Sequence, residues 1–391
     1  MIKLNNIISI FVFFINPTLG IIYSAIKSNT KTFFFLVTLY MAFVAYVMIP
    51  YSSMDIFRYY NMYERLNVIS FGQIGDYFNV NYFIVFFVKI INMLGLNKEF
   101  IPFSTVFISY GVLFYSFYYY LERKSYNSIN NVIICLCVLS VALFFGSASG
   151  LRNGLSVSIS ILAIVMLSKR KSRLSYFLFF IAAFVHSFTI IIFLLSIISY
   201  YIRNKKFYWV VFLISIFYLI SGVNDLIIEY INIVFPSEMS TYIIKEFIDS
   251  TSVGVNAEMS VINAIIFNGT TFISFLICFY ITIICFFKKN DYINRLLVLF
   301  LSLCLVFYNY PVFFGRYNNV FIIISALVLI YDFIFYKKKK VFFIFLFFTL
   351  LYSIVNFLRF RYIFTDSIFS IFKPMIYLFL ETVNLNNLRD L

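Results

Sequence analysis

The single histidine and one arginine of this chain are candidates for a proton acceptor and an anion-binding group. His186 is the only histidine among 391 residues and lies inside an apolar block. Arg152 heads another apolar run, directly after the small residues Gly-Ser-Ala-Ser-Gly. A neutral imidazole accepts a proton near pH 7, and a guanidinium binds phosphate or carboxylate through parallel hydrogen bonds. The pair predicts a base beside an anion-binding group, with a structural histidine and a snorkelling arginine as the competing interpretations.

A polar segment with aromatic residues, PYSSMDIFRYY, follows the second apolar run. It holds Asp55, Arg58, Tyr59 and Tyr60. A carboxylate and a guanidinium beside aromatic rings are suited to holding sugars. Because Asp55 and Arg58 are three residues apart, they would share a helix face and could simply pair with each other. Both interpretations stay open at this point.

A second arginine, Arg316, follows a break at Asn-Tyr-Pro and is succeeded by Tyr317 in the sequence GRYNN. It predicts a second contact to an anion. The chain has no Walker loop, dinucleotide glycine fingerprint, HExxH motif or nucleophile elbow, so nucleotide and metal-dependent hydrolysis have no support. The five cysteines all lie in apolar runs, which favours buried thiols. We therefore expect neither a metal nor a cofactor.

The elements that must position these residues are apolar. Hydrophobic residues make up 63% of the chain and charged residues 12%, whereas a soluble domain has about 25% charged residues. The net charge of +14 is divided among short basic clusters between apolar runs, as in cytoplasmic loops of membrane proteins. No basic domain is present to hold nucleic acid.

The apolar runs predict an all-α, polytopic integral membrane protein of about 11–14 transmembrane or half-spanning helices. We expect it to form a single multi-pass domain over residues 1–391. A shorter amphipathic piece is expected at about 365–382. The expected spans are about 6–26, 31–50, 80–95, 101–121, 131–148, 152–168, 174–185, 187–202, 207–222, 261–287, 293–311, 317–335 and 341–358.

The basic clusters predict which loops face the cytoplasm. Residues 174–202 connect two such clusters, so they should form two half-spans with His186 at the turn near the outer side. External loops are expected at about 51–79 and 223–260. Counting crossings from both directions requires an odd number of crossings to be lost between 51 and 130. The weakest span there is 80–95, which would then be re-entrant or interfacial. The basic clusters are Lys27/Lys31, 169–173, Arg203/Lys205/Lys206, Lys288/Lys289 and 337–340.

The order of four short motifs resembles the EpsG-like group of bacterial O-antigen and exopolysaccharide polymerases, the Wzy type. The motifs are PYSSMDIFRYY, GLRNGLSVSISILAIVMLSKRK, FLFFIAAFVHSFTIII and GRYNN. In that group an acidic residue followed by tyrosines closes an early span, Arg-Gln opens a small-residue helix, and His-Ser and Arg-Tyr follow. The resemblance covers about residues 15–330 and departs from the pattern at Asn153, where glutamine is usual.

This resemblance implies a metal-independent membrane glycosyltransferase. Its donor and acceptor would be undecaprenyl-pyrophosphate-linked oligosaccharides, joined in the inner membrane at a site facing the periplasm. Arg152 and Arg316 would contact pyrophosphate, His186 would be the base, and Asp55 would orient the acceptor or replace His186 as base. The lipid bilayer, a chain-length regulator and a flippase are the partners it implies, and we expect a GT-C-like multi-pass architecture.

Three other classes compete with this interpretation. An O-antigen ligase also uses an arginine and a histidine in its site, but it usually carries a larger external loop than 223–260. A flippase or transporter buries coupled charges near the bilayer midplane and often shows internal repeats, whereas the charged candidates here stand at the ends of spans. A membrane acyltransferase also uses a single histidine.

Overall fold

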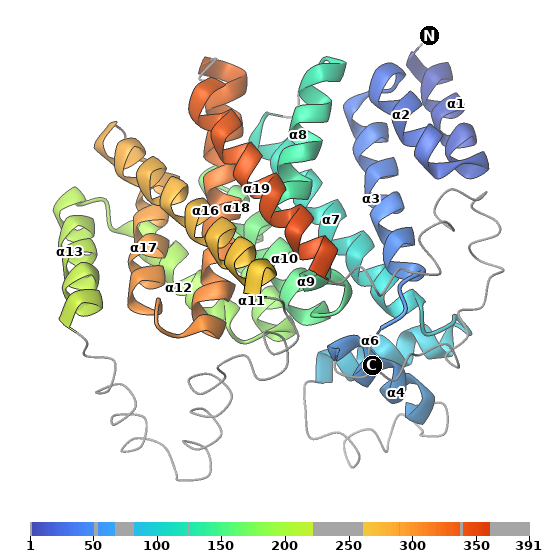
Figure 1. Ribbon diagram of the computed structural model, residues 1–391, viewed down its shortest axis with the longest axis horizontal. Helices are drawn as coiled ribbons and strands as arrows, with labels where there is room; N and C mark the ends of the chain where they lie inside the picture. Colours follow the sequence, from blue (N-terminus) through green and yellow to red (C-terminus); the bar gives the residue numbers. More distant parts are fainter. Residues whose placement is uncertain are drawn as a thin grey trace. The chain divides into compact units, whose positions relative to one another are not determined.

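The computed structural model describes residues 2–50, 54–66, 82–122, 126–221, 261–288, 290–336 and 339–359. These residues are predominantly helical and contain no strand (Figure 1). Within these described ranges, four helices are long and apolar enough to cross a membrane, and several shorter apolar helices accompany them. The prediction of an all-α, polytopic membrane protein is confirmed.

The chain falls into two compact units, each described here by itself. One comprises Met1–Ile190 and Asn356–Leu391, and the other Ile191–Val355. The prediction that both belong to a single domain stays a prediction. Helices α12 and α19 begin in one unit and end in the other. The helices are α1 (Ile2–Ile15), α2 (Pro17–Lys27), α3 (Thr30–Tyr46), α4 (Asp55–Leu66), α6 (Tyr82–Met93), α7 (Phe100–Tyr120), α8 (Ser128–Val141), α9 (Phe144–Ala148), α10 (Leu151–Ser168), α11 (Ser172–Val185), α12 (Thr189–Tyr201), α13 (Lys205–Ser221), α16 (Val261–Lys288), α17 (Tyr292–Val306), α18 (Pro311–Tyr336) and α19 (Lys339–Arg359).

The first apolar run forms a helical hairpin rather than the single span expected over residues 6–26. Asn16 ends α1 and caps α2, with its side chain accepting a hydrogen bond from the backbone of Leu19 at 3.0 Å. Proline follows at the first position of α2, where its missing N–H costs nothing. The two helices pack so closely that a Cβ on Gly20 would lie 2.3 Å from the Cα of Phe13.

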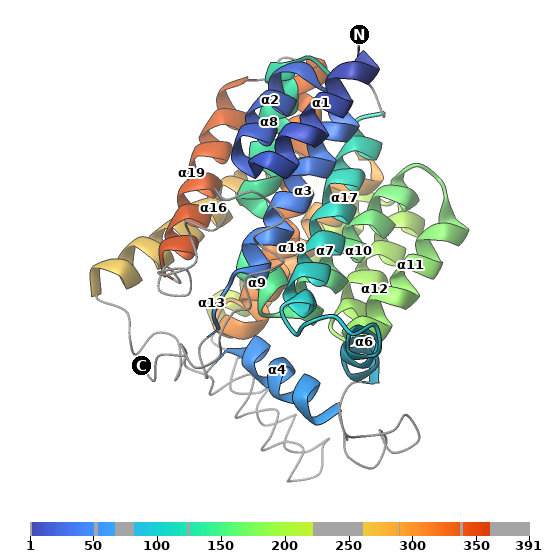
Figure 2. The same cartoon turned by 90° about the vertical axis from the view of Figure 1, so that its right-hand side faces the viewer.

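Four helices of the first unit run between the same two ends. α3 and α7 are antiparallel, because Phe34 stacks on Phe114 at 4.9 Å and Tyr46 meets Phe100 at 5.2 Å. α10 runs parallel to α7, since Lys169 at its C-terminus lies over the ring of Tyr120. α11 then returns along α10. Figure 2 shows α1 and α2 at one end of these helices and α4 and α6 at the other.

We call these the hairpin end and the α4 end. The hairpin end holds α1, α2 and the starts of α3, α8 and α11. The α4 end holds the last residue of α3, helices α4 and α6, the starts of α7 and α10, and the last turn of α11. All candidate residues of the first unit therefore lie at the α4 end, and the basic cluster 169–173 lies at the other.

Helix α6 corresponds to the expected span 80–95, the weakest span in the region where the two counts of membrane crossings disagree. It has 12 residues, which span about 18 Å, whereas a bilayer core is about 30 Å thick. It packs against α4 and does not connect the two ends. Its buried Lys89 donates a hydrogen bond of 2.7 Å to the carbonyl of Leu66, at the C-terminus of α4. The expected span 80–95 is thus a short helix over Tyr82–Met93, and its re-entrant or interfacial position stays a prediction.

The second unit is built around α17, which packs against α13, α16 and α18. The buried guanidinium of Arg295 donates to the carbonyls of Ser199 at 2.9 Å and Asn290 at 2.6 Å. It also bonds to the hydroxyl of Tyr208. These contacts fasten α12, α13 and α17 together at the end that carries the expected cytoplasmic cluster.

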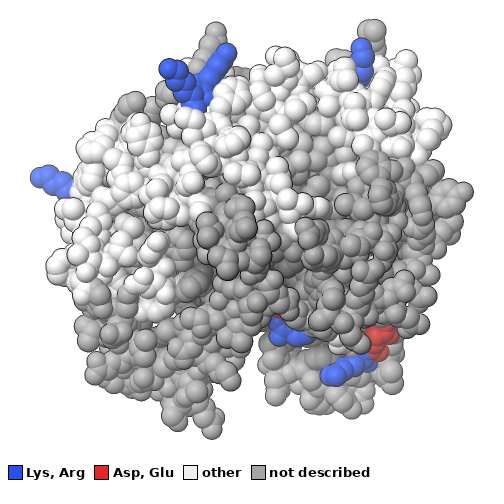
Figure 3. Space-filling model, viewed as in Figure 1, with Lys and Arg blue, Asp and Glu red and all other residues white. Residues whose placement is uncertain are grey.

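Charged side chains are sparse on the visible face of the molecule. In Figure 3, Lys and Arg lie at the edges of the described surface, and the described atoms between them are uncharged. Large apolar side chains are exposed on many helices, among them Phe180 at 72% and Phe217 at 70%. Such a surface is expected where lipid rather than water surrounds the helices.

Candidate functional site

Arg152 lies at the start of α10, directly after the tight junction between α9 and α10. The helices approach so closely that a Cβ on Gly154 would lie 2.5 Å from the Cα of Ser147. From α7, the hydroxyl of Thr105 donates a 3.1 Å hydrogen bond to the carbonyl of Ser147. The expected span 131–148 is therefore divided into α8 and α9, and the small residues of the junction serve helix packing. This junction fixes where α10, and with it Arg152, begins.

The guanidinium of Arg152 is half-buried and hydrogen-bonded to the hydroxyl of Tyr59 on α4. Tyr59 is 8% exposed. Burial raises the pKa of its hydroxyl above the ordinary 10.0, and the positive charge of Arg152 partly opposes that rise. Asp55 lies one turn earlier on α4 and also influences Tyr59. The structure thus brings together two motifs that lie almost a hundred residues apart.

Asp55 and Arg58 form an ion pair with each other, as one interpretation of their spacing predicted. Both are substantially exposed, with side-chain exposures of 43% and 75%. An exposed pair of this kind contributes roughly 0–1 kcal/mol to stability. The carboxylate of Asp55 therefore remains accessible to a ligand at little energetic cost.

His186 is the residue at which α11 ends. Its backbone is extended, its N–H bonds to the carbonyl of Ala182 at 2.9 Å, and α12 begins at Thr189. The predicted turn between two short helices is confirmed. The half-buried imidazole meets the ring of Phe188 edge-on at 4.8 Å. α6 contacts this end of α11 through Phe83 and Phe184, whose rings are 6.1 Å apart.

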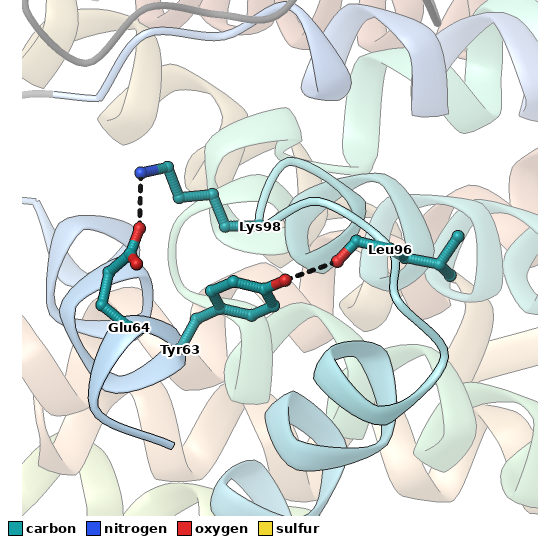
Figure 4. A network of polar contacts seen from close by, with 4 residues as sticks. All are labelled: Tyr63, Glu64, Leu96 and Lys98. Atoms are coloured by element: carbon teal, nitrogen blue, oxygen red, sulfur yellow. Dashed lines mark hydrogen bonds and ion pairs between the residues drawn. The ribbon is translucent and has the colours of Figure 1, made fainter. Parts of the chain in front are cut away.

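A second polar cluster at the α4 end escaped the sequence argument. Tyr63 of α4 donates a 2.8 Å hydrogen bond to the carbonyl of Leu96, and Lys98 bonds to Glu64 at 2.9 Å (Figure 4). Both contacts join α4 to the segment between α6 and α7. The next residue, Glu99, is only 5% exposed. The sequence feature that could have identified Glu99 is its position between two apolar runs.

Tyr60 belongs to the same cluster. Its ring lies under the ammonium of Lys98, 5.8 Å from the centroid, and its hydroxyl is in the electrostatic field of Glu99. The hydroxyl is buried and has no hydrogen-bond partner among the described residues. The same is true of the side-chain oxygen of Asn153, beside Arg152. Burial raises the pKa of Tyr60 well above 10.0.

Arg316 and Tyr317 lie in the second unit, near the start of α18. Arg316 is half-buried, and Tyr317 is buried with its ring stacked on Phe307 at 5.9 Å. The turn before α18 meets the far end of α13, where Tyr218 and Tyr310 share a hydrogen bond. Arg316 thus lies at the end of the second unit opposite Arg295. The expected loop 223–260, most of loop 51–79 and the amphipathic piece 365–382 lie outside the described residues.

These helices define a class: a polytopic membrane protein with its polar candidates collected at helix ends. Residues 31–370 match the model of the EpsG family. The chain belongs to the EpsG family, as the sequence motifs predicted. It is therefore a membrane protein of polysaccharide biosynthesis. Comparison with curated proteins and with solved structures finds no match.

Proposed function

We propose that this protein is a polymerase that joins undecaprenyl-pyrophosphate-linked oligosaccharide repeat units by glycosyl transfer. The reaction would take place on the periplasmic face of the bacterial inner membrane. The observation that best supports the proposal is the contact between Arg152 and Tyr59. It gives an EpsG-family protein a fixed guanidinium at the helix ends that also hold a carboxylate and the only imidazole.

The chemistry can be written without a metal ion. A sugar hydroxyl of the acceptor attacks the anomeric carbon of the donor chain, and a new carbon–oxygen bond forms. The bond between that carbon and the pyrophosphate oxygen breaks, and its electron pair leaves with the lipid pyrophosphate. A base takes the hydroxyl proton. Since negative charge develops on the pyrophosphate, preorganised guanidinium groups stabilise the transition state more than the ground state.

We assign the roles accordingly. Arg152 binds the pyrophosphate, held in place by Tyr59, and the GRYNN motif assigns Arg316 a pyrophosphate contact as well. His186 is the base, and its neutral form suits that task near pH 7. Asp55 orients the acceptor sugar or replaces His186 as base. The remaining members, Arg58, Tyr60 and Tyr317, contribute to substrate binding.

A complementation experiment tests this function. A deletion strain receives the wild-type gene, Arg152→Ala or Arg173→Ala, and its lipid-linked or lipopolysaccharide-linked glycan is resolved on a gel. Arg173 is an exposed arginine at the hairpin end, so its variant controls for the loss of one positive charge. We expect wild type and Arg173→Ala to restore the ladder. Arg152→Ala should leave only single repeat units, because one lost transition-state donor costs about 100- to 1,000-fold in rate.

The other outcomes identify the alternatives. Loss of even the single repeat in the deletion strain would indicate a ligase or a flippase. A ladder unchanged by deletion would remove the protein from this pathway. A full ladder with both Arg152→Ala and His186→Ala would contradict the roles assigned to these two residues.

A further inference from the structure

The buried carboxyl group of Glu99 has no part in the mechanism above. It lies in the residue before α7, at the same end of the first unit as Arg152. Glu99 is 5% exposed, although ionisable groups are seldom buried in proteins without a partner. It occupies the N-cap position of α7 but forms no capping hydrogen bond from its side chain to the helix. Helix capping therefore does not explain its burial.

Among the described residues, the hydrogen-bonding capacity of this carboxyl is largely unused. The bond it receives comes from its own backbone N–H, whereas an ionised carboxylate can accept about four. The neighbouring cation, Lys98, directs its ammonium to Glu64 on α4 at 2.9 Å and over the ring of Tyr60. Burial consequently raises the pKa of Glu99 above its ordinary 4.5, with only partial compensation from Lys98.

A hydroxyl group without a partner accompanies this carboxyl. Tyr60 is 2% exposed, and its hydroxyl bonds to no described residue. Successive side chains of a helix point about 100° apart. Tyr59 bonds to Arg152, whereas Tyr60 has Lys98, the neighbour of Glu99, over its ring and lies in the electrostatic field of Glu99. One turn of α4 therefore joins the proposed pyrophosphate site to the cluster around Glu99.

We propose that Glu99 and Tyr60 form a second binding site, which holds a hydroxyl group of the acceptor sugar. A sugar hydroxyl donates one hydrogen bond and accepts others, so it satisfies the carboxylate and the tyrosine hydroxyl together. A phosphate or carboxylate ligand would be repelled by Glu99. The ligand class is therefore a neutral, polyhydroxylated glycan. This inference rests on the proposed function, because the acceptor must reach the site beside Arg152.

Direct binding tests the site without requiring polymer formation. The probe is the repeat-unit oligosaccharide of the organism's own polysaccharide, released from its lipid carrier and added to the full-length protein in nanodiscs. Saturation-transfer NMR reports the binding. The variants are Glu99→Gln and Tyr60→Phe, which remove a charge or a hydroxyl with little change in volume. The matched controls are Glu122→Gln and Tyr119→Phe, both at the hairpin end.

We expect the probe to bind wild type and both controls, and to bind Glu99→Gln and Tyr60→Phe about tenfold more weakly. Equal binding by all five proteins, or no binding to wild type, would overturn the inference. The polymer ladder is measured in parallel for the same variants. A failed ladder in the wild-type complementation contradicts the polymerase function, whereas the binding pattern decides the role of Glu99 separately. A single cooperative thermal transition in nanodiscs shows that each variant is folded.

Discussion

The two ends of the first unit treat their buried polar groups differently. At the hairpin end the hydroxyl of Ser24 has no partner among the described residues, but the groups that join one helix to another are paired: Thr30 donates to Asn131 at 2.9 Å and accepts from the backbone of Tyr126 at 3.2 Å. Asn6 accepts from the backbone of Asn29 at 3.1 Å. At the α4 end, three groups keep unused capacity among the described residues. These groups are the carboxyl of Glu99, the hydroxyl of Tyr60 and the side-chain oxygen of Asn153.

This difference distinguishes polar groups that hold helices together from polar groups that are available to a ligand. A buried polar group without a partner costs about 1–3 kcal/mol, so its retention needs a compensating advantage. The paired groups of the hairpin end fasten helices to one another, and Arg295 does the same in the second unit with backbone carbonyls. The unpaired groups of the α4 end can obtain their partners from a ligand.

The largest expected effect concerns the junction that positions Arg152. Gly154→Ala places a Cβ 2.4 Å from the hydroxyl oxygen of Ser147 and 2.5 Å from its Cα. The helices must move apart, and we expect a loss of about 3 kcal/mol in stability together with the loss of polymer. Gly269→Ala is the control, since a Cβ there meets nothing within 4 Å. Equal thermal midpoints for the two variants would contradict the close approach.

The next effect sharpens the structural side of the comparison. Thr30→Val removes a hydroxyl that serves both Asn131 and the backbone of Tyr126. We expect a loss of about 2 kcal/mol, measured as a lower midpoint of the helical circular dichroism signal. The activity of each folded molecule should not change. A shortened polymer at normal protein level would show that the hairpin end is more than structural.

A smaller effect is expected for the residue that holds Arg152. Tyr59→Phe removes one hydrogen bond to the guanidinium but keeps the ring, and we expect polymerisation to slow about tenfold, equal to ~1.4 kcal/mol. Repeat-unit consumption by the protein in nanodiscs gives the rate. Tyr63→Phe, which loses a bond to a backbone carbonyl instead, should keep the wild-type rate. Equal rates for all three proteins would remove the positioning role of Tyr59.

The smallest effect is a gain in stability. Because the pKa of Glu99 is raised in the folded protein, its stabilising contribution is complete below 4.5 and is lost as pH rises through the raised value. Glu99→Gln lacks this dependence. We expect it to unfold at a slightly higher temperature than wild type at pH 7, and with a smaller difference near pH 4. A variant less stable than wild type at pH 7 would indicate a structural carboxyl.

Most helices could be predicted from apolar runs, because a span must satisfy its own backbone within lipid. The predicted spans were wrong where hydrophobicity alone does not distinguish a helix that crosses the membrane from a hairpin or a short helix. Asn16 and Pro17 divide the first run into a hairpin, and α6 is too short to cross. Arg152 and His186 were recognisable as rare ionisable residues at the ends of runs. Glu99 is also an ionisable residue at the end of an apolar run, but it belongs to no recognisable motif. Only its burial in the structure identified it as a candidate.

The sequence by itself determined that this is a helical membrane protein of the EpsG family. Its apolar composition indicates that lipid surrounds the helices, and the order of four motifs indicates the family. It also identified the residues capable of proton transfer and anion binding. The tertiary structure decided which of them meet. Tyr59 contacts Arg152 and Tyr60 lies in the electrostatic field of Glu99 because α4 is at the same end of the first unit as the starts of α7 and α10. No local pattern encodes a contact between residues so far apart in the chain.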